Sequence, residues 1–406
     1  MTPTAFAAAD LGASSGRVIL GTLADGRFHL EEVARFANGP LPDGDSIRWD
    51  AAALFANIRA GLNAAQARSG GLASVGVDTW GDYGRLDATG TLLEPPFNYR
   101  DARTTGVPER LFAGLPAERL YSIAGLQVMP FNTIFQLVAD RGWDEVARIL
   151  LLPDLFGYWL TGRGVAEVTI ASTTGLLDVA GRRWSTELGQ HLSSAYGIPV
   201  DRILPELVEP GTVLADSTPG VLDQVTPVVA VGSHDTASAV ASIPAVGSDF
   251  AFISSGTWSL VGLELPSPVL TEESRQADFT NELGVDGTVR YLKNVMGLWV
   301  LNESVRTWRA QGMEIDLIGL LAEAARQPGL ACVVDIDDER LLPPGDMPSR
   351  LRTLAAEGGH TLGESPAQIA RCILDSLALA YRRTIRNACR LAKHAARAAH
   401  QAHCRQ

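Results

Sequence analysis

Two short turns of small residues, each placed between apolar segments, constrain the fold of this chain more than any other feature. The first turn lies in DLGASSGR (10–17), between the apolar runs AFAAAD and RVILGTL. The second lies in SSGTWSL (254–260), inside the apolar stretch 250–265. Turns of small residues let backbone N–H groups approach phosphate oxygens closely. The repeated pattern of strand, turn and strand therefore predicts two similar α/β domains facing a cleft.

The remaining patterns predict strands alternating with helices. Apolar runs indicate strands at 5–10, 17–23, 29–36 and 72–81. A helix is expected over 50–61, where Asp50 caps it and apolar residues share one face, and another begins at Ser365 and Pro366. The stretch 145–162 is expected to be mostly helical with a break at Pro153. In 226–242 a Val-rich strand is expected to end at Gly232, before a helix that Thr236 caps.

Composition bounds the class of protein. A chain of 406 residues corresponds to roughly two to three domains. Its net charge of −12 argues against a nucleic-acid-binding surface. The sequence has no apolar run of ~18 residues and no basic N-terminal region, so neither a membrane span nor a signal peptide is expected. The four cysteines (Cys332, Cys372, Cys389 and Cys404) lack CxxC spacing, which favours a reduced, cytoplasmic protein. The oligomeric state is not predicted.

Common motifs for other chemistries are missing from the sequence. There is no GxxxxGK[ST] loop, no GxGxxG after a strand, no HExxH and no GxSxG. These absences argue against P-loop, dinucleotide-binding, zinc-protease and α/β-hydrolase sites.

Nine motifs stand in order along the chain: DLGASSGR, VDTWGDYGRLD, YRDART, PFNTIFQL, PDLFGYWLTGR, ASTTGLLD, GSHDTASAV, SSGTWSL and LKNVMGLW. Together they resemble the motifs of the FGGY family of carbohydrate kinases. The resemblance implies an α/β, actin-like ATPase fold of two RNase H-like domains, with ATP as phosphoryl donor and Mg²⁺ as cofactor. Within the family, the motifs are most similar to those of kinases that phosphorylate L-rhamnulose at its 1-hydroxyl. The implied domains are 1–243 for sugar and catalysis and 244–386 for the nucleotide, followed by an atypical tail, 387–406.

The resemblance assigns the sugar-side residues. Asp235, just after a Val-rich strand, is the expected general base, although an acid at a helix start is also favoured by the helix dipole alone. His234 and Thr236 flank the sugar in this interpretation, but a lone histidine is more often a satisfied core residue. The resemblance also places Gly81, Asp82 and Asn294 at the sugar. Trp80, Phe131 and Trp299 either line an apolar patch for the 6-deoxy methyl group or simply pack in the core.

The resemblance also assigns the nucleotide-side residues. The phosphate loop comprises Ala13, Ser14, Ser15, Gly16 and Arg17, with Arg17 offering charge-assisted hydrogen bonds. Asp10 is the expected Mg²⁺ residue, acting through water. Thr257, in the second turn, and Asn302 are expected to contact ATP. A wide hairpin turn without ligand is the alternative interpretation of 10–17.

Two departures from the family pattern affect the expected function. The motif DTWGDYG is one residue shorter than usual between its Gly and Asp. The family's Gly-rich adenosine segment is replaced by NACRLAKHAARAAHQAHCRQ (387–406), so we expect a truncated second domain with an exposed sheet edge and poor solubility. The tail could extend a helix but could not replace a strand that lies between two others. The alternatives to an active kinase are therefore an inactive sugar-binding remnant, a kinase for another ketose or polyol, and a binding role for the basic tail.

Overall fold

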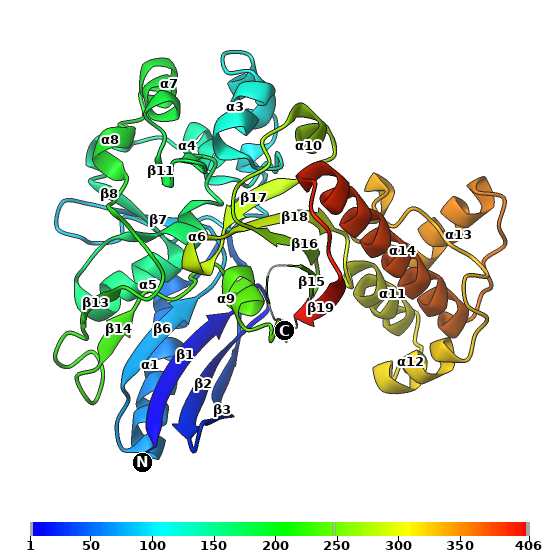
Figure 1. The fold of residues 1–406 in the computed structure, drawn as a ribbon, viewed down its shortest axis with the longest axis horizontal. Helices are drawn as coiled ribbons and strands as arrows, with labels where there is room; N and C mark the ends of the chain where they lie inside the picture. Colours follow the sequence, from blue (N-terminus) through cyan, green and yellow to red (C-terminus); the bar gives the residue numbers. More distant parts are fainter. Residues whose placement is uncertain (1–2, 246, 248, 403–406) are drawn as a thin grey trace. The chain divides into compact units, whose positions relative to one another are not determined.

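The structure, a computed structural model, describes residues 3–245, 247 and 249–402 (Figure 1). The chain divides into two compact units. The first contains the chain up to Ser242 together with Leu265–Tyr291, and the second contains Ile243–Glu264 and the chain from Leu292 onward. No helix in the described ranges is long and apolar enough to cross a membrane.

A mixed sheet forms the centre of the first unit. Its order in the described chain is β13-β14-β6-β1-β2-β3. The bounds are β1 Thr4–Leu11, β2 Ser15–Ala24, β3 Arg27–Ala37, β6 Ser74–Asp78, β13 Val213–Asp216 and β14 Pro227–Val229. Strands β1, β2 and β3 form an antiparallel meander, whereas β6 runs parallel to both β1 and β14. The ends of β1 and β6 consequently lie at the same edge of the sheet.

Alternation along β1 separates a buried face from a more exposed one. Ala5, Ala7, Ala9 and Leu11 are buried in a core that includes apolar residues of α1 (Ala51–Ser69) and α5 (Leu152–Thr161). Because successive side chains of a strand point to opposite faces, Asp10 lies on the other face. Helix α1 begins as expected, with the Asp50 carboxylate accepting from the Ala53 N–H at 2.9 Å.

The rest of the first unit contains short helices and short strands, many of which contribute apolar side chains to a second core. Its helices are α2 Val107–Phe112, α3 Ala117–Ala124, α4 Thr133–Ala139, α6 Val168–Ala171, α7 Thr186–Tyr196, α8 Val200–Ile203, α9 Asp235–Ala241 and α10 Glu272–Gln276. Its other strands are β4 Leu41–Asp43, β5 Ser46–Arg48, β7 Tyr83–Leu86, β8 Arg148–Leu151, β9 Ala166–Glu167, β10 Leu177–Asp178, β11 Arg183–Trp184, β12 Leu207–Val208 and β17 Thr280–Leu283.

A second sheet and a helical layer follow. The sheet order in the described chain is β17-β18-β16-β15-β19, with β15 Phe250–Ser255, β16 Ser259–Leu265, β18 Val289–Val295 and β19 Ala398–Ala402. The helices are α11 Trp299–Ala310, α12 Leu317–Ala325, α13 Met347–Glu357 and α14 Pro366–Ala392. As expected, Ser365 caps α14, and Ile369, Ile373 and Leu377 are buried along it.

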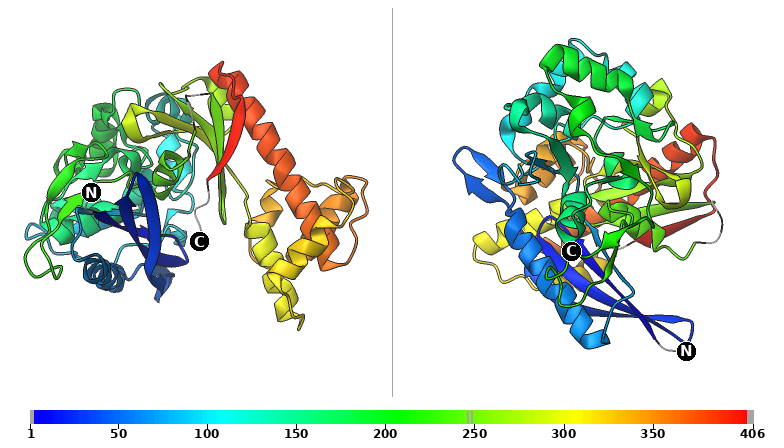
Figure 2. Two further views of the ribbon diagram at one scale, coloured as in Figure 1. Left: turned by 60° about the horizontal axis from the view of Figure 1, so that its bottom comes forward. Right: turned by 90° about the vertical axis from the view of Figure 1, so that its left-hand side faces the viewer.

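Two local expectations were wrong. Residues 148–151 form a strand, and Pro153 stands in the first turn of α5, where a proline has no hydrogen bond to lose. The N-cap of α9 is His234 rather than Thr236. The tail contributes a strand at the edge of the second sheet, where β19 pairs in parallel with β15 from Phe250 to Ser254 (Figures 1 and 2). The end of the tail, including Cys404, lies outside the described residues.

Candidate functional site

The β1–β2 hairpin carries an ion pair at its closed end. Asp10 and Arg17 are cross-strand partners, and Arg17 Nε and Nη2 lie 2.8 and 2.5 Å from Asp10 Oδ2. The turn itself is shorter than expected, because Ser15, Gly16 and Arg17 belong to β2 and only residues 12–14 lie between the strands. Asn38 braces the turn by donating from its amide side chain to the Gly12 carbonyl at 2.8 Å and from its backbone to Ser14 at 3.1 Å.

Two further carboxylates gather near this ion pair in the first unit. Asp78 ends β6 and stands beside Asp10 in the parallel register. Burial, followed by the charges of Asp10 and Asp235, raises the pKa of Asp78 well above its ordinary value. Asp235 is held by its backbone N–H, which donates to the Thr79 carbonyl at 3.2 Å, just past the end of β6. Burial also raises the pKa of Asp235, while His234 opposes part of the rise.

The carboxylates suit a magnesium ion that arrives with a phosphate ligand. The described residues contain no group of three or more His, Cys, Asp or Glu side chains that could hold a metal by themselves. Mg²⁺, however, usually keeps several waters and takes one or two carboxylates together with substrate phosphates. Asp10 supplies one carboxylate, and Asp78 Oδ1 is buried with no hydrogen-bond partner in the described part of the chain. The donor set therefore fits Mg²⁺.

Asp82 lies in a closely packed polar pocket. Its Oδ2 accepts from Trp49 Nε1 at 2.6 Å, Trp80 Nε1 at 3.2 Å and the Tyr99 N–H at 2.9 Å, and its Oδ1 accepts from Gln136 Nε2 at 3.0 Å. The carboxyl is buried, and burial raises its pKa to about 6. These four donors orient Asp82 firmly. Neighbouring Gly81 leaves no room for a side chain, since a Cβ there would stand 2.8 Å from Thr173 Oγ1.

The predicted aromatic patch is only partly brought together. Trp80 packs on Trp49 with ring centroids 4.3 Å apart, and Phe131 packs on Tyr99 at 5.8 Å. Both pairs belong to the first unit, around Asp82. Trp299 is in the second unit, where its indole N–H donates to the Leu341 carbonyl at 3.0 Å.

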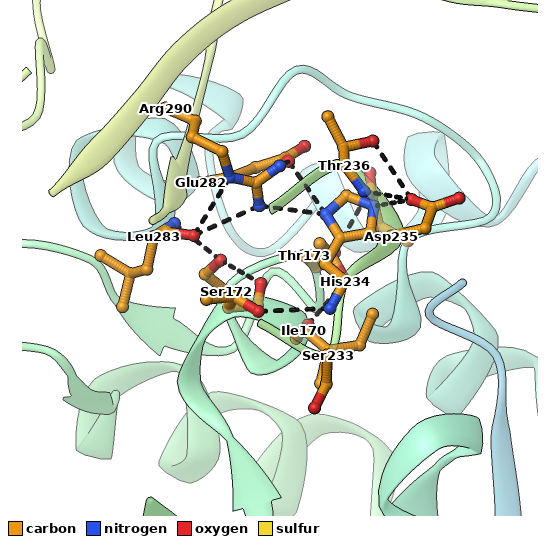
Figure 3. Close-up of polar contacts among 12 residues, drawn as sticks. Ile170, Ser172, Thr173, Ser233, His234, Asp235, Thr236, Glu282, Leu283 and Arg290 are labelled. Atoms are coloured by element: carbon orange, nitrogen blue, oxygen red, sulfur yellow. Dashed lines mark hydrogen bonds and ion pairs between the residues drawn. The ribbon is translucent and has the colours of Figure 1, made fainter. Parts of the chain in front are cut away.

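His234 and Thr236 flank Asp235, as Figure 3 shows. The Thr236 N–H and hydroxyl donate to Asp235 Oδ1 at 2.6 and 3.1 Å. His234 Nε2 lies 3.5 Å from the same oxygen. On its other side, His234 Nδ1 faces Arg290 Nη2 at 3.0 Å and Glu282 Oε2 at 3.2 Å. The histidine is thus a largely buried residue that also touches the candidate base.

The remaining predicted residues lie in the second unit. Thr257 is in the turn of residues 256–258 between β15 and β16. Two carbonyls of this turn accept from the start of α11: the Leu298 N–H donates to Gly256 and the Trp299 N–H to Thr257, both at 3.0 Å. Asn302 lies one turn into α11 and borders a cavity of about 320 Å³ with Val305, Arg306, Arg309 and Leu317. Asn294 lies in β18. The turn that carries Thr257 is therefore hydrogen-bonded to the first residues of α11, the helix that carries Asn302.

Sequence reasoning missed several members of the site. Asp78 stands inside the quoted motif VDTWGDYGRLD, and the parallel pairing of β1 with β6 that brings it beside Asp10 could have identified it. Gln136 stands inside the quoted motif PFNTIFQL, but its contact with Asp82 joins segments 54 residues apart. Glu282 and Arg290 lie outside the quoted motifs, and both are distant in sequence from His234.

Comparisons with known proteins match both parts of the chain. The model of the FGGY family of carbohydrate kinases, N-terminal domain, matches residues 6–241, and that of the C-terminal domain matches 251–400. A protein named rhamnulokinase from Enterococcus faecalis is 41% identical over 384 residues, covering 93% of this chain and 76% of its own. A rhamnulokinase from Bacteroides thetaiotaomicron is 39% identical, covering 94% and 79%. Xylulose kinase from Lactobacillus acidophilus has a similar structure, with a TM-score of 0.77 at 15% identity over 99% of this chain and 81% of its own.

Proposed function

The chain belongs to the FGGY family of carbohydrate kinases, and from this premise we propose that Asp235 is the base with which it phosphorylates a ketose. It is an ATP-dependent sugar kinase, and its curated relatives support rhamnulokinase activity. The reaction that we propose is transfer of the γ-phosphoryl group of ATP to the 1-hydroxyl of L-rhamnulose, giving L-rhamnulose 1-phosphate and ADP.

The placement of Asp235 carries this proposal. Phosphoryl transfer needs a carboxylate that orients the acceptor hydroxyl and takes its proton. Asp235 is half-buried, its backbone is anchored to the end of β6, and its pKa is raised by burial, which makes the carboxylate a better proton acceptor. It accepts the hydroxyl proton while the sugar oxygen bonds to the γ-phosphorus. The bond from that phosphorus to the β,γ-bridging oxygen breaks, and ADP leaves with the bonding electrons.

The other residues bind and orient the two substrates. On the sugar side we assign Gly81, Asp82, His234, Thr236 and Asn294. On the nucleotide side we assign residues 13–17, Thr257 and Asn302. Asp10 would hold Mg²⁺, which when bound neutralises charge on the phosphates of ATP. Arg17 would exchange its contact with Asp10 for a phosphate oxygen.

The test is Asp235→Asn, which keeps size and polarity but removes the base. Loss of a general base typically costs about 10²–10⁴-fold in rate, and we expect kcat to fall within that range. ADP release is measured with L-rhamnulose, L-fuculose and D-xylulose, and Mg·ATP and sugar binding by calorimetry. Asp50→Asn is the matched control, because asparagine caps a helix as well as aspartate does.

The possible results separate the alternatives. Turnover that survives in Asp235→Asn would refute the role of this carboxylate. Sugar binding without ADP release by the unaltered chain would favour the non-catalytic alternative. A preference for L-fuculose or D-xylulose over L-rhamnulose would reassign the substrate within the family.

A further inference from the structure

A buried ion pair stands behind His234 in the first unit. Glu282, in β17, and Arg290, in β18, have side chains that are 9% and 0% exposed, and Arg290 Nη1 lies 3.1 Å from Glu282 Oε2. Arg290 Nε and Nη2 also donate to the Leu283 carbonyl, both at 3.2 Å. In Figure 3 this pair approaches the imidazole from the side opposite Asp235.

The backbone of His234 is held equally firmly. Its N–H donates to Thr169 Oγ1 at 3.2 Å, and the neighbouring Ser233 N–H donates to Glu167 Oε2 at 3.0 Å. The Leu283 N–H donates to Ser172 Oγ at 2.9 Å, which ties β17 to the segment that carries Thr169. The ring and the ion pair behind it therefore have little freedom to move apart.

The contacts around the ring select one tautomer. Arginine has donors only, so Arg290 Nη2, 3.0 Å from Nδ1, requires a lone pair on that nitrogen. An ionised carboxylate has acceptors only, so Asp235 Oδ1, 3.5 Å from Nε2, favours a proton there. A proton on Nδ1 would gain a contact with Glu282 at 3.2 Å, but it would oppose both Arg290 and Asp235.

Glu282 completes the arrangement as an anion. Burial by itself would raise the pKa of Glu282, but Arg290 and His234 hold it below its ordinary value. The carboxylate thereby balances the charge of the guanidinium, which is buried next to the imidazole. A buried charge without such a partner would be costly.

We propose that Arg290 and Glu282 are positioning residues that hold His234 with its proton on Nε2, directed at Asp235 Oδ1. This inference rests on Asp235 being the base, as proposed above. The N–H and hydroxyl of Thr236 donate to Asp235 Oδ1, and His234 Nε2 lies closest to the same oxygen, at 3.5 Å. Oδ2 is consequently the oxygen that takes the proton of the sugar hydroxyl.

The experiment measures both the tautomer of His234 and the rate of the kinase reaction. The ring-nitrogen NMR signals of ¹⁵N-histidine-labelled protein, assigned by loss of signal in His234→Gln, report where the proton lies. Arg290→Met removes the donor and leaves Glu282 as the only partner of Nδ1, so the proton should move to Nδ1. Residues that orient a metal-bound histidine from behind are typically worth about 10- to 100-fold in activity. By analogy, we expect kcat to fall by about the same factor.

A double variant separates this role from a merely structural one. In Arg290→Met with Glu282→Met the partner that draws the proton to Nδ1 is also gone, and Asp235 alone should restore the Nε2 proton. The double variant should therefore be more active than Arg290→Met, and it replaces a buried ion pair by apolar residues, which proteins often tolerate. Arg85→Gln is the control, because it removes an arginine from another ion pair of the first unit, with Glu94, that has no histidine partner.

Three results would overturn the inference: a proton on Nδ1 in the unaltered protein, an unchanged tautomer in Arg290→Met, or a double variant no more active than the single one. The proposed base has its own test in Asp235→Asn. If that variant stays active, the proposed function fails, while the tautomer measurement still decides whether Arg290 and Glu282 set the proton on His234.

Discussion

The β1–β2 hairpin closes beside an ion pair, Asp10 with Arg17, whereas the β15–β16 hairpin closes on two serines, Ser255 and Ser259. Both turns are braced through their carbonyl oxygens. Asn38 donates to the first turn, and the start of α11 donates to the second. Hydrogen bonds to turn carbonyls thus support the hairpin that carries the ion pair in one unit, and they anchor the start of α11 in the other. In our proposal the first hairpin binds Mg²⁺ and the phosphates of ATP, and the second positions Thr257 and Asn302.

The same contrast extends to the carboxyl groups of the two units. Among the described residues, the carboxyls whose pKa is raised lie in the first unit: Asp78, Asp82, Asp140, Asp154, Glu167 and Asp235, each with burial as the main cause. In the second unit, hydrogen bonds from arginines lower the pKa of Glu303 and bring that of Asp338 to about 2. Buried acids near functional sites are a common sign of acid–base chemistry, which agrees with a base in the first unit.

The largest expected difference between the hairpins concerns ATP. Hydrogen bonds to charged groups are worth about 1.5–3 kcal/mol and neutral ones about 0.5–1.5 kcal/mol. We therefore expect Arg17→Met to raise the KM for Mg·ATP by about 10- to 150-fold, and Thr257→Val by about 2- to 12-fold. Initial rates at saturating sugar measure both values.

Arg35→Met is the matched control for this comparison. Arg35 is the cross-strand neighbour of Arg17 in β3 and pairs with Glu32 on the surface, so its loss removes the same charge at nearly the same place. A KM for Mg·ATP that rises as much in Arg35→Met as in Arg17→Met would mean that general charge, not a phosphate contact, distinguishes the first hairpin.

Gly297 tests the anchoring role of the second hairpin. A Cβ at this position would stand 2.6 Å from Ser259 Oγ, 2.7 Å from the Trp258 carbonyl carbon and 2.8 Å from the Gly256 carbonyl oxygen. Overpacking typically costs about 1–3 kcal/mol, so Gly297→Ala should lower the free energy of unfolding by that amount. Denaturant unfolding measures it, with Gly39→Ala as control, because a Cβ at Gly39 meets nothing within 4 Å. Equal stability of the two variants would show that the turn does not depend on this close approach.

The smallest effect is a pH dependence from the buried acids of the first unit. Burial raises the pKa of Asp82 from 3.8 to about 6, so the folded protein binds this proton more tightly than the unfolded chain does. Its contribution to stability is present below the unfolded pKa and is lost as the pH rises through about 6. Between about pH 5 and about pH 7 the loss amounts to about 1 kcal/mol. Asp82→Asn should remove that part of the pH dependence; an identical pH profile of unfolding would contradict it.

The elements that local patterns specify were predicted well. The β1–β2 and β15–β16 hairpins, the Asp50 cap and the Ser365 start of α14 follow from alternation and capping residues within a few positions of each other. The fold class is confirmed by matches to both FGGY domains.

Features that depend on distant parts of the chain were not predicted. Strand β19 is built from alanine, histidine and glutamine, which carry no strand pattern, and it forms where β15 offers backbone groups for pairing. His234 contacts Glu282 of β17 and Arg290 of β18, which follow it by about fifty residues in the sequence. Nothing in the local sequence of these two charged residues indicates that they are buried. Long-range pairing, not local propensity, determines both.

In our proposal, in which residues 10–17 bind the phosphates of ATP, the contact between Asp10 and Arg17 has a consequence for nucleotide affinity. Each of these side chains already neutralises the other, so a phosphate and its counter-cation must compete with an existing interaction instead of filling two vacant charges. Binding is then an exchange of partners in which the total charge of the hairpin stays balanced throughout. Added salt weakens the interactions lost and the interactions gained alike, so affinity at this hairpin should vary little with ionic strength. An exchange of this kind favours ligands that bring both signs of charge together over a free anion, so the proposed phosphate turn should prefer metal-bound ATP to free ATP.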